Sequence, residues 1–152
     1  MYIQLYYRNK QTYNNINGQY GGKKMKNKQK HRNRHKNNKH QIMFHVSEPW
    51  FSLISTGLKT VEGRKNKGKF KDMKVGDVIV WTNDDFGERY YKTKVVRKTE
   101  YKTFYDYLQA EGLDKCLPSI PTIEQGLSVY FKYYTKEDEA RYGVVAIELE
   151  HL

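Results

Sequence analysis

The sequence predicts an α+β domain, in which helices pack on a small twisted or barrel-like sheet behind a basic N-terminal extension. The predicted segments follow one another irregularly, as helix, three strands, two helices and a final strand. The strands are short and separated by turns, which argues against a doubly wound parallel sheet. Composition and charge also change abruptly near Met43.

Residues 1–42 differ in composition from the rest of the chain. They hold 11 of the 28 Lys and Arg residues and none of the 17 Asp and Glu residues, so residues 43–152 are formally neutral. Asn, Lys, Gln and Gly dominate the segment, which cannot bury enough apolar area to offset chain ordering. We therefore predict a disordered basic extension over 1–42 and one domain over 43–152. The extension either binds nucleic acid non-specifically or is an accidental low-complexity addition.

The cysteine count and the hydropathy limit the compartment and the partners. The single cysteine, Cys116, excludes an internal disulfide and fits a reducing, intracellular compartment, either cytoplasmic or nuclear. No apolar run approaches the roughly 18 residues of a membrane span, and no secretory signal pattern is present, so no membrane partner is expected. The histidines of the extension have no cysteine partners, so neither a metal nor another cofactor is expected.

The first predicted helix covers residues 47–57. Ser47 is its expected N-cap, Pro49 is tolerated in the first turn, and Gly57 suits the C-terminal end. Three predicted strands follow. Residues 59–64 read as short and extended, 78–81 as an apolar strand after a Gly-Asp turn, and 89–98 as a half-buried strand with polar alternation.

The second half of the domain is predicted as two helices and a strand. Thr103 caps the helix over 103–112, and Thr122 has the spacing of a capping box at the start of the helix over 122–134. The residues between these helices are expected to form a loop, and 135–143 a solvated turn or one short helical turn. Residues 144–150 then form the last strand, with one apolar face that consists of Val145, Ile147 and Leu149.

The segment "EPWFSLISTGLKTVEGRKNKGKFKDMKVGDVIVW" resembles the opening of the ASCH domain family, a branch of the PUA-like superfamily. The family pattern is a short helix, then G-x-K-x-x-E-x-R, then a Gly-Asp turn into a strand. In this sequence the pattern consists of Gly57, Lys59, Glu62, Arg64, Gly76 and Asp77. The C-terminal stretch "YFKYYTKEDEARYGVVAIELE" resembles the closing helix and strand of the family.

This resemblance implies a small PUA-like β-barrel with flanking helices. It also implies that the motif lines a cleft between the first helix and the barrel, and that the ligand is RNA, a nucleotide or a nucleoside. Some related bacterial proteins are amidohydrolases that remove the acetyl group of N4-acetylcytidine, and ribonuclease activity has been attributed to other members.

The chemistry of the motif fits such a ligand independently of the resemblance. If residues 61–64 are extended, Glu62 and Arg64 share one face, and Lys59 can lean over the same side. A carboxylate between two cations stays ionised and holds them in place. Arginine offers a planar fork to a phosphate or a base edge, and a glutamate can accept from an exocyclic amine. The ordinary alternative is an exposed ion pair that contributes little to stability.

Two further residues are candidates for ligand contact. Lys69 belongs to a run of seven cations between Lys59 and Lys74 that contains only two carboxylates, whereas residues 100–150 are acidic. This polarity favours an anionic ligand beside the motif, although such a run is often just a solvated surface. Trp50 either stacks on a base or belongs to the core, and the second role is the more common one for a tryptophan in such a position.

Catalysis is a second hypothesis. The acetylcytidine hydrolases resemble K-T-x-T-x-R, with the second threonine as nucleophile, but here Glu62 occupies that position and Thr60 is displaced from it by two residues. Glu62 with Lys59 remains a candidate pair for proton transfer, as in phosphodiester cleavage. Glu111 matches the position of a third catalytic group in that subfamily, but its ordinary interpretation is an exposed helix-end glutamate.

The sequence thus predicts an RNA- or nucleotide-binding module with Trp50, Lys59, Glu62, Arg64 and Lys69 as ligand contacts. A hydrolase that acts on RNA or a modified nucleoside, with Lys59, Glu62 and Glu111 as catalytic residues, is the first alternative. A protein-interaction adaptor without a nucleotide ligand is the second.

Overall fold

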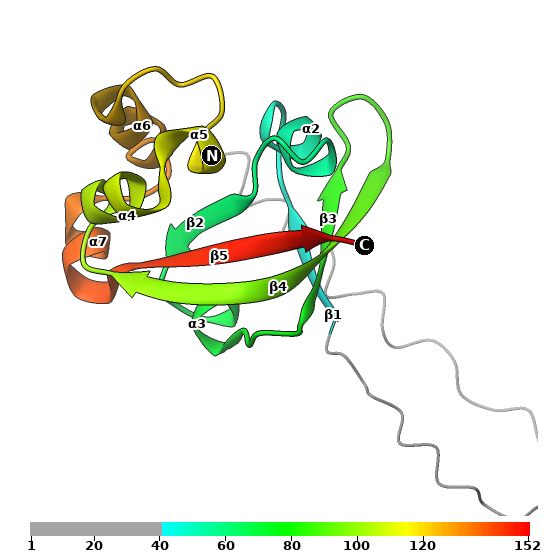
Figure 1. Ribbon diagram of the computed structural model, residues 1–152, viewed down its shortest axis with the longest axis horizontal. Helices are drawn as coiled ribbons and strands as arrows, with labels where there is room; N and C mark the ends of the chain where they lie inside the picture. Colours follow the sequence, from blue (N-terminus) through cyan, green and yellow to red (C-terminus); the bar gives the residue numbers. More distant parts are fainter. Residues whose placement is uncertain (1–40) are drawn as a thin grey trace, which may run out of the picture. The chain divides into compact units, whose positions relative to one another are not determined.

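The computed structural model describes residues 41–152, and the predictions made for residues 1–40 lie outside this range. The elements in chain order are β1 (Gln41–His45), α2 (Trp50–Ser55), β2 (Val61–Lys65), α3 (Lys69–Asp72), β3 (Val78–Asn83), β4 (Arg89–Tyr101), α4 (Phe104–Glu111), α5 (Leu113–Cys116), α6 (Ile123–Tyr130), α7 (Lys136–Tyr142) and β5 (Val144–His151) (Figure 1).

The five strands form one sheet in the order β1-β3-β4-β5-β2. Strand β1 pairs parallel to β3, and the other three pairs are antiparallel. A register shift between Val95 and Arg97 interrupts the pairing of β4 with β5, at a position where a bulge increases twist. The sheet curls into a half-barrel with β1 and β2 as its edges, so the predicted α+β class with a barrel-like sheet is confirmed (Figure 1).

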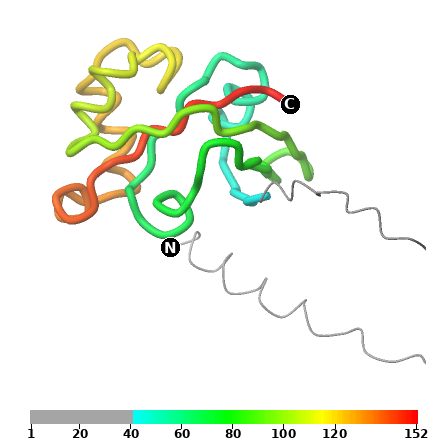
Figure 2. The backbone as a smooth tube through the Cα atoms, turned by 60° about the horizontal axis from the view of Figure 1, so that its bottom comes forward, coloured from blue at the N-terminus to red at the C-terminus, as the bar shows by residue number. Residues whose placement is uncertain are grey.

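Strand β5 is buried on both faces and separates two apolar clusters. Val145, Ile147 and Leu149 belong to the cluster that α2 and α3 cover, as the predicted apolar face requires. Val144 and Ala146 point the other way, into the cluster beneath α4, α5 and α6. Figure 2 shows this arrangement, with the helices drawn in yellow on one side of the red strand and the green α3 segment on the other.

The two main predicted helices are confirmed. The Thr103 hydroxyl accepts a hydrogen bond of 3.0 Å from the Asp106 amide, and α4 ends before Gly112, which has a φ of 91°. The Thr122 hydroxyl accepts a bond of 3.3 Å from the Gln125 amide at the start of α6. Helix α6 ends at Tyr130, four residues earlier than predicted, but the aromatic residues that follow it still pack on the same cluster.

Several elements differ from the predictions. Strand β1 was not predicted and includes residues 41–42, which were assigned to the disordered extension. The loop predicted after Gly112 contains α5, and the segment before the Gly-Asp turn contains α3. Residues 136–142 form a complete helix that begins with a capping box between Thr135 and Asp138. Within residues 41–152 no helix combines the length and the apolar character that crossing a membrane requires.

The predicted N-cap of the first helix is wrong. Helix α2 begins at Trp50, after Pro49, and Ser47 makes no capping hydrogen bond with its side chain. The Glu48 carboxylate accepts from the Ser52 amide at 3.1 Å instead, because its longer side chain reaches an amide group of the first turn. Gly57 follows the helix with a φ of 77°, which agrees with its predicted place at the C-terminal end.

Candidate nucleic-acid site at the edge of the sheet

A fixed turn places the motif directly after α2. The Lys59 amide donates to the Leu53 carbonyl at 2.9 Å, which folds the chain back against the helix. The Thr60 amide donates to the Lys115 carbonyl at 3.1 Å, and the Thr60 carbonyl accepts from the Leu149 amide at 2.9 Å. The motif is therefore connected to helix α5 on one side and to strand β5 on the other before β2 begins.

Lys59 is a buried cation, with a relative exposure of 2%. Its ammonium donates to the Val61 carbonyl at 2.9 Å and to the Cys116 carbonyl, and it lies 3.1 Å from Glu62 Oε2. The Trp50 ring centroid lies 5.9 Å from the same nitrogen. The three ammonium protons therefore have three acceptors, one of which is a carboxylate. In this arrangement Lys59 has a structural role.

Glu62 connects the buried lysine to a more accessible arginine. Its second carboxylate oxygen accepts from Arg64 Nε at 2.5 Å, so one carboxylate, on a side chain that is only 7% exposed, bridges two cations. Burial alone would raise the pKa of Glu62, but the charges of Lys59 and Arg64 outweigh this effect and lower the pKa below that of an ordinary glutamate. The carboxylate is thus ionised at neutral pH, and the predicted arrangement of Glu62 and Arg64 on one face of β2 is confirmed.

Arg64 is the member of the motif that reaches solvent. Its side chain is 25% exposed, compared with 2% for Lys59 and 7% for Glu62. Its guanidinium carbon lies 5.2 Å from the centroid of the Phe70 ring, and Phe70 in turn stacks on Phe44 at 4.2 Å. Burial alone would lower the pKa of Arg64. Glu62 and the Tyr134 hydroxyl outweigh this effect and raise the pKa. The guanidinium is held from two sides and stays charged.

Lys69 and Arg64 lie over the same aromatic pair. Lys69 is exposed on α3, and its ammonium lies 5.8 Å from the Phe44 ring, while Arg64 lies over Phe70. The sequence analysis did not identify Phe44 and Phe70 as site residues, because neither belongs to the motif. Trp50, the other predicted contact, is half-buried and packs against both apolar clusters beside Lys59.

Glu111, predicted as a third catalytic group, belongs to a different cluster. Both of its carboxylate oxygens bind Arg97, at 2.8 and 2.5 Å, and Oε1 also accepts from the Tyr101 hydroxyl at 2.7 Å. The bonds from Arg97 dominate and lower the pKa of Glu111, whereas burial and the bond to Glu111 raise the pKa of Tyr101 to about 12. Glu111 is buried rather than an exposed helix-end residue, and no hydrogen bond or ion pair within residues 41–152 joins it to Lys59 or Glu62.

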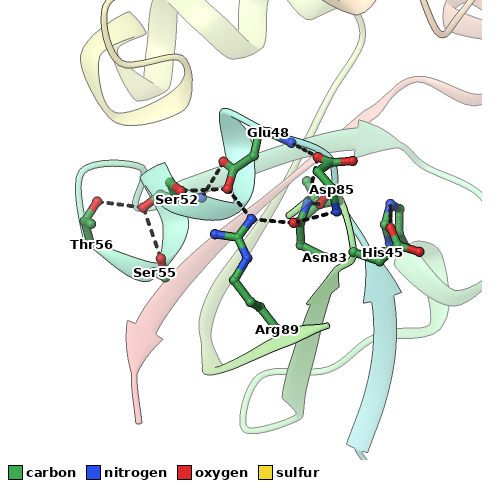
Figure 3. Close-up of polar contacts among 10 residues, drawn as sticks. His45, Glu48, Ser52, Ser55, Thr56, Asn83, Asp85 and Arg89 are labelled. Atoms are coloured by element: carbon green, nitrogen blue, oxygen red, sulfur yellow. Dashed lines mark hydrogen bonds and ion pairs between the residues drawn. The ribbon is translucent and has the colours of Figure 1, made fainter. Parts of the chain in front are cut away.

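A polar network that the sequence did not predict anchors the other end of α2 (Figure 3). Arg89 Nη2 donates to Glu48 Oε1 at 2.5 Å and to the Asn83 side chain. Asn83 is buried and donates to the Val46 carbonyl and to Asp85, both at 2.9 Å. The Asp85 carboxylate also accepts from the Glu48 amide at 2.7 Å.

This network explains how α2 keeps its position. Glu48 binds both the amide and the hydroxyl of Ser52 inside the helix, at 3.1 and 2.8 Å. The same carboxylate binds Arg89 on β4, so the first turn of α2 is tied to the β3–β4 hairpin (Figure 3). Trp50 is in that turn and Lys59 follows the helix, so the network positions these two members of the candidate site. Within residues 41–152 no group of three or more His, Cys, Asp or Glu side chains is arranged to hold a metal ion.

A curled half-barrel that carries G-x-K-x-x-E-x-R around its edge strand defines a PUA-like domain. A family model described as the ASCH domain matches residues 44–152, so the chain belongs to the ASCH domain family.

Solved structures support this membership. The chain is 36% identical to the hypothetical protein PH0355, with a TM-score of 0.67 over 74% of this chain and 99% of that chain. It is 37% identical to protein PF0455 from Pyrococcus furiosus, with a TM-score of 0.62 over 74% of this chain and 97% of that chain. The S128A mutant of ZmASCH from Zymomonas mobilis shares the fold at 14% identity, with a TM-score of 0.54 over 74% of this chain and 68% of that chain. No curated protein sequence matches the chain.

Proposed function

We propose that this ASCH domain binds RNA or a nucleotide through Arg64, with Lys69 as a second cationic contact. The observation that carries the proposal is the state of Arg64, a partly exposed guanidinium held by an ionised and buried carboxylate. Glu62 accepts from Nε, which leaves the Nη amino groups to other acceptors. Such a fork is suited to a phosphate or to the edge of a guanine.

In this proposal Lys59, Glu62 and Trp50 support the site. Lys59 keeps Glu62 charged, and Glu62 in turn fixes the orientation of Arg64, which lowers the entropic cost of ligand binding. Phe70, which is half-buried and stacks on the buried Phe44, lies beneath Arg64, where a single-stranded base could contact its ring. These elements together favour a ligand with both an anionic group and an aromatic base.

The hydrolase alternative is less well supported. A general base operates best when its pKa lies near the working pH, but the two cations outweigh the effect of burial and lower the pKa of Glu62 from its ordinary value. Lys59 donates to three protein acceptors and is almost completely buried. Glu111 is bound by Arg97 and Tyr101. Binding without turnover is therefore the function that we propose.

The proposal is tested by substitution of Arg64 in the full chain. We expect Arg64→Gln to weaken binding of a labelled ten-nucleotide single-stranded RNA by about 10- to 100-fold, as removal of a charged, planar contact typically does. Fluorescence anisotropy at fixed salt measures the dissociation constant, and residues 1–40 contribute the same background to every variant. Lys92→Gln, at an exposed position on β4, is the control and should change the affinity less than twofold.

Two results would contradict the proposal. An unchanged affinity of Arg64→Gln would exclude the assigned contact, and absence of RNA binding by the parent chain would favour the protein-interaction adaptor. Denaturing gels of the same samples should show intact RNA. Cleavage that disappears in Glu62→Gln would instead support the hydrolase.

A further inference from the structure

A second cationic group lies next to Arg64, where the end of β2 meets helix α7. Lys65 and Lys67 from β2 and the turn after it converge with Arg141 on the ring of Tyr142. The Lys67 ammonium lies 4.6 Å from the ring centroid, the Lys65 ammonium 5.4 Å and the Arg141 guanidinium carbon 5.2 Å. Lys67 also donates to the Tyr142 hydroxyl at 3.1 Å.

Among residues 41–152, only one of these three cations has a carboxylate partner. Asp138 pairs with Lys65 at 2.8 Å, but within residues 41–152 neither Lys67 nor Arg141 forms a salt bridge. Both of these side chains are exposed. The hydrogen bond from Lys67, together with the charges of the three cations, lowers the pKa of Tyr142. Lys67 and Arg141 are thus two cations without an ion-pair partner in the part of the chain that the structure describes, although the first turn of α7 also carries Glu137.

The ring explains how the cations can gather without a full set of counter-charges. The negative face of an aromatic ring attracts each cation, which partly offsets their mutual repulsion. A bound anion would remove the remaining repulsion. A group of cations that is already assembled needs less ordering when an anion binds, so this arrangement is suited to phosphate recognition.

The group is continuous with the candidate nucleotide site. Lys65 follows Arg64 in the chain, so their Cα atoms lie about 3.8 Å apart. The Lys65 ammonium lies 5.6 Å from the ring of Tyr134, and the hydroxyl of the same tyrosine contributes to raising the pKa of Arg64. Because β2 is an edge strand, side chains from its two faces can meet beside Tyr134.

We propose that Lys65, Lys67, Arg141 and Tyr142 form a phosphate subsite for the nucleotides that flank the one bound at Arg64. This inference rests on the proposed function and deepens it, because it makes the ligand a single-stranded RNA rather than a free nucleotide. A strand that crosses Tyr134 would place one base beside Arg64 and a neighbouring phosphate between Lys67 and Arg141.

The double variant Lys67→Ala/Arg141→Ala tests this subsite in the full chain. Its expected effect is an approximately tenfold decrease in affinity for the ten-nucleotide single-stranded RNA at 0.15 M salt. The slope of log affinity against log salt should become shallower by about 0.7 for each phosphate that the variant no longer neutralises. Lys92→Ala/Lys94→Ala removes the same charge from β4, seven or more residues from the end of that strand beside α7, and should change the affinity less than twofold.

The outcomes separate the subsite from the proposed function. If Lys67→Ala/Arg141→Ala behaves as Lys92→Ala/Lys94→Ala does while Arg64→Gln binds more weakly, the subsite is excluded and the proposed function stands. If neither Lys67→Ala/Arg141→Ala nor Arg64→Gln binds more weakly, both are excluded. A tenfold decrease in affinity together with a shallower salt slope supports the subsite, and thermal denaturation should show that both double variants remain folded.

Discussion

Replacement of Glu62 by alanine is expected to lower the free energy of unfolding by about 3–5 kcal/mol, the typical cost of removing one partner of a buried ion pair. The variant would leave the Lys59 ammonium, with its 2% exposure, bound to two carbonyl groups and without a counter-charge. Loss of the carboxylate would destabilise the charge of Arg64 less, because a quarter of its side chain already reaches solvent. Urea unfolding followed by circular dichroism measures the decrease.

Two comparison variants make this prediction specific. Glu62→Gln keeps the shape and an amide oxygen for Lys59, so we expect a smaller decrease in stability than for alanine. Glu150→Ala breaks the exposed pair with Lys94, whose side chains are 53% and 31% exposed, and should cost less than about 1 kcal/mol. An equal, small decrease in Glu62→Ala and Glu150→Ala would show that the buried pair does not stabilise the edge of the sheet.

Replacement of Gly63 by alanine is the second large effect that we expect. A Cβ atom at this position would lie 2.5 Å from two ring carbons of Tyr107 and 2.8 Å from its hydroxyl oxygen. Tyr107 is completely buried, and its hydroxyl bonds to the Val61 carbonyl at 3.4 Å and to Tyr130 at 3.2 Å, so the ring has little room to move. The resulting strain should cost about 1–3 kcal/mol of unfolding free energy.

Gly126→Ala is the matched control for this substitution. A Cβ atom there would lie 3.0–3.2 Å from the methyl groups of three leucines, which can rotate away, and alanine favours the helix by roughly 1 kcal/mol over glycine. We expect little net change. The cost of Gly63→Ala should also fall when Tyr107 is replaced by leucine; a cost that is the same in both backgrounds would mean that the ring is not its cause.

Those parts of the fold that depend on local signals could be predicted from the sequence. The hydroxyls of Thr103 and Thr122 cap α4 and α6 as expected, because capping involves residues only three positions apart. Strand β1 was missed although Ile42, Phe44 and Val46 alternate with more exposed residues. The alternation is short and directly follows the Asn- and Lys-rich run, so the predicted start of the domain lies two residues too late.

The candidate site was only partly predictable. The common face of Glu62 and Arg64 follows from strand periodicity, and the structure confirms it. The burial of Lys59 could not be predicted, because one of its acceptors is the carbonyl of Cys116, 57 residues away. The pairing of Arg97 with Glu111 likewise joins a strand to a helix through tertiary packing, and no local pattern indicates it.

The structure gives the three charged residues of the motif different environments. Lys59 and Glu62 form the buried support, and Arg64 projects from it over Phe70. The opposite end of α2 is held by Glu48 and Arg89, so both ends of the segment that carries Trp50 and precedes the motif are anchored. A preorganised guanidinium on a rigid edge is the central element of the proposed RNA site.

The most direct test of this claim is a nuclear magnetic resonance titration of the arginine Nε–H groups in the full chain with the ten-nucleotide RNA. The chain has seven arginines, and the resonance of Arg64 is assigned by its disappearance in Arg64→Gln. We predict that this resonance shifts and saturates with the dissociation constant from anisotropy, while that of Arg89, bound to Glu48 and Asn83, stays unchanged. Saturation of the protein with RNA without any change at Arg64 would contradict the account.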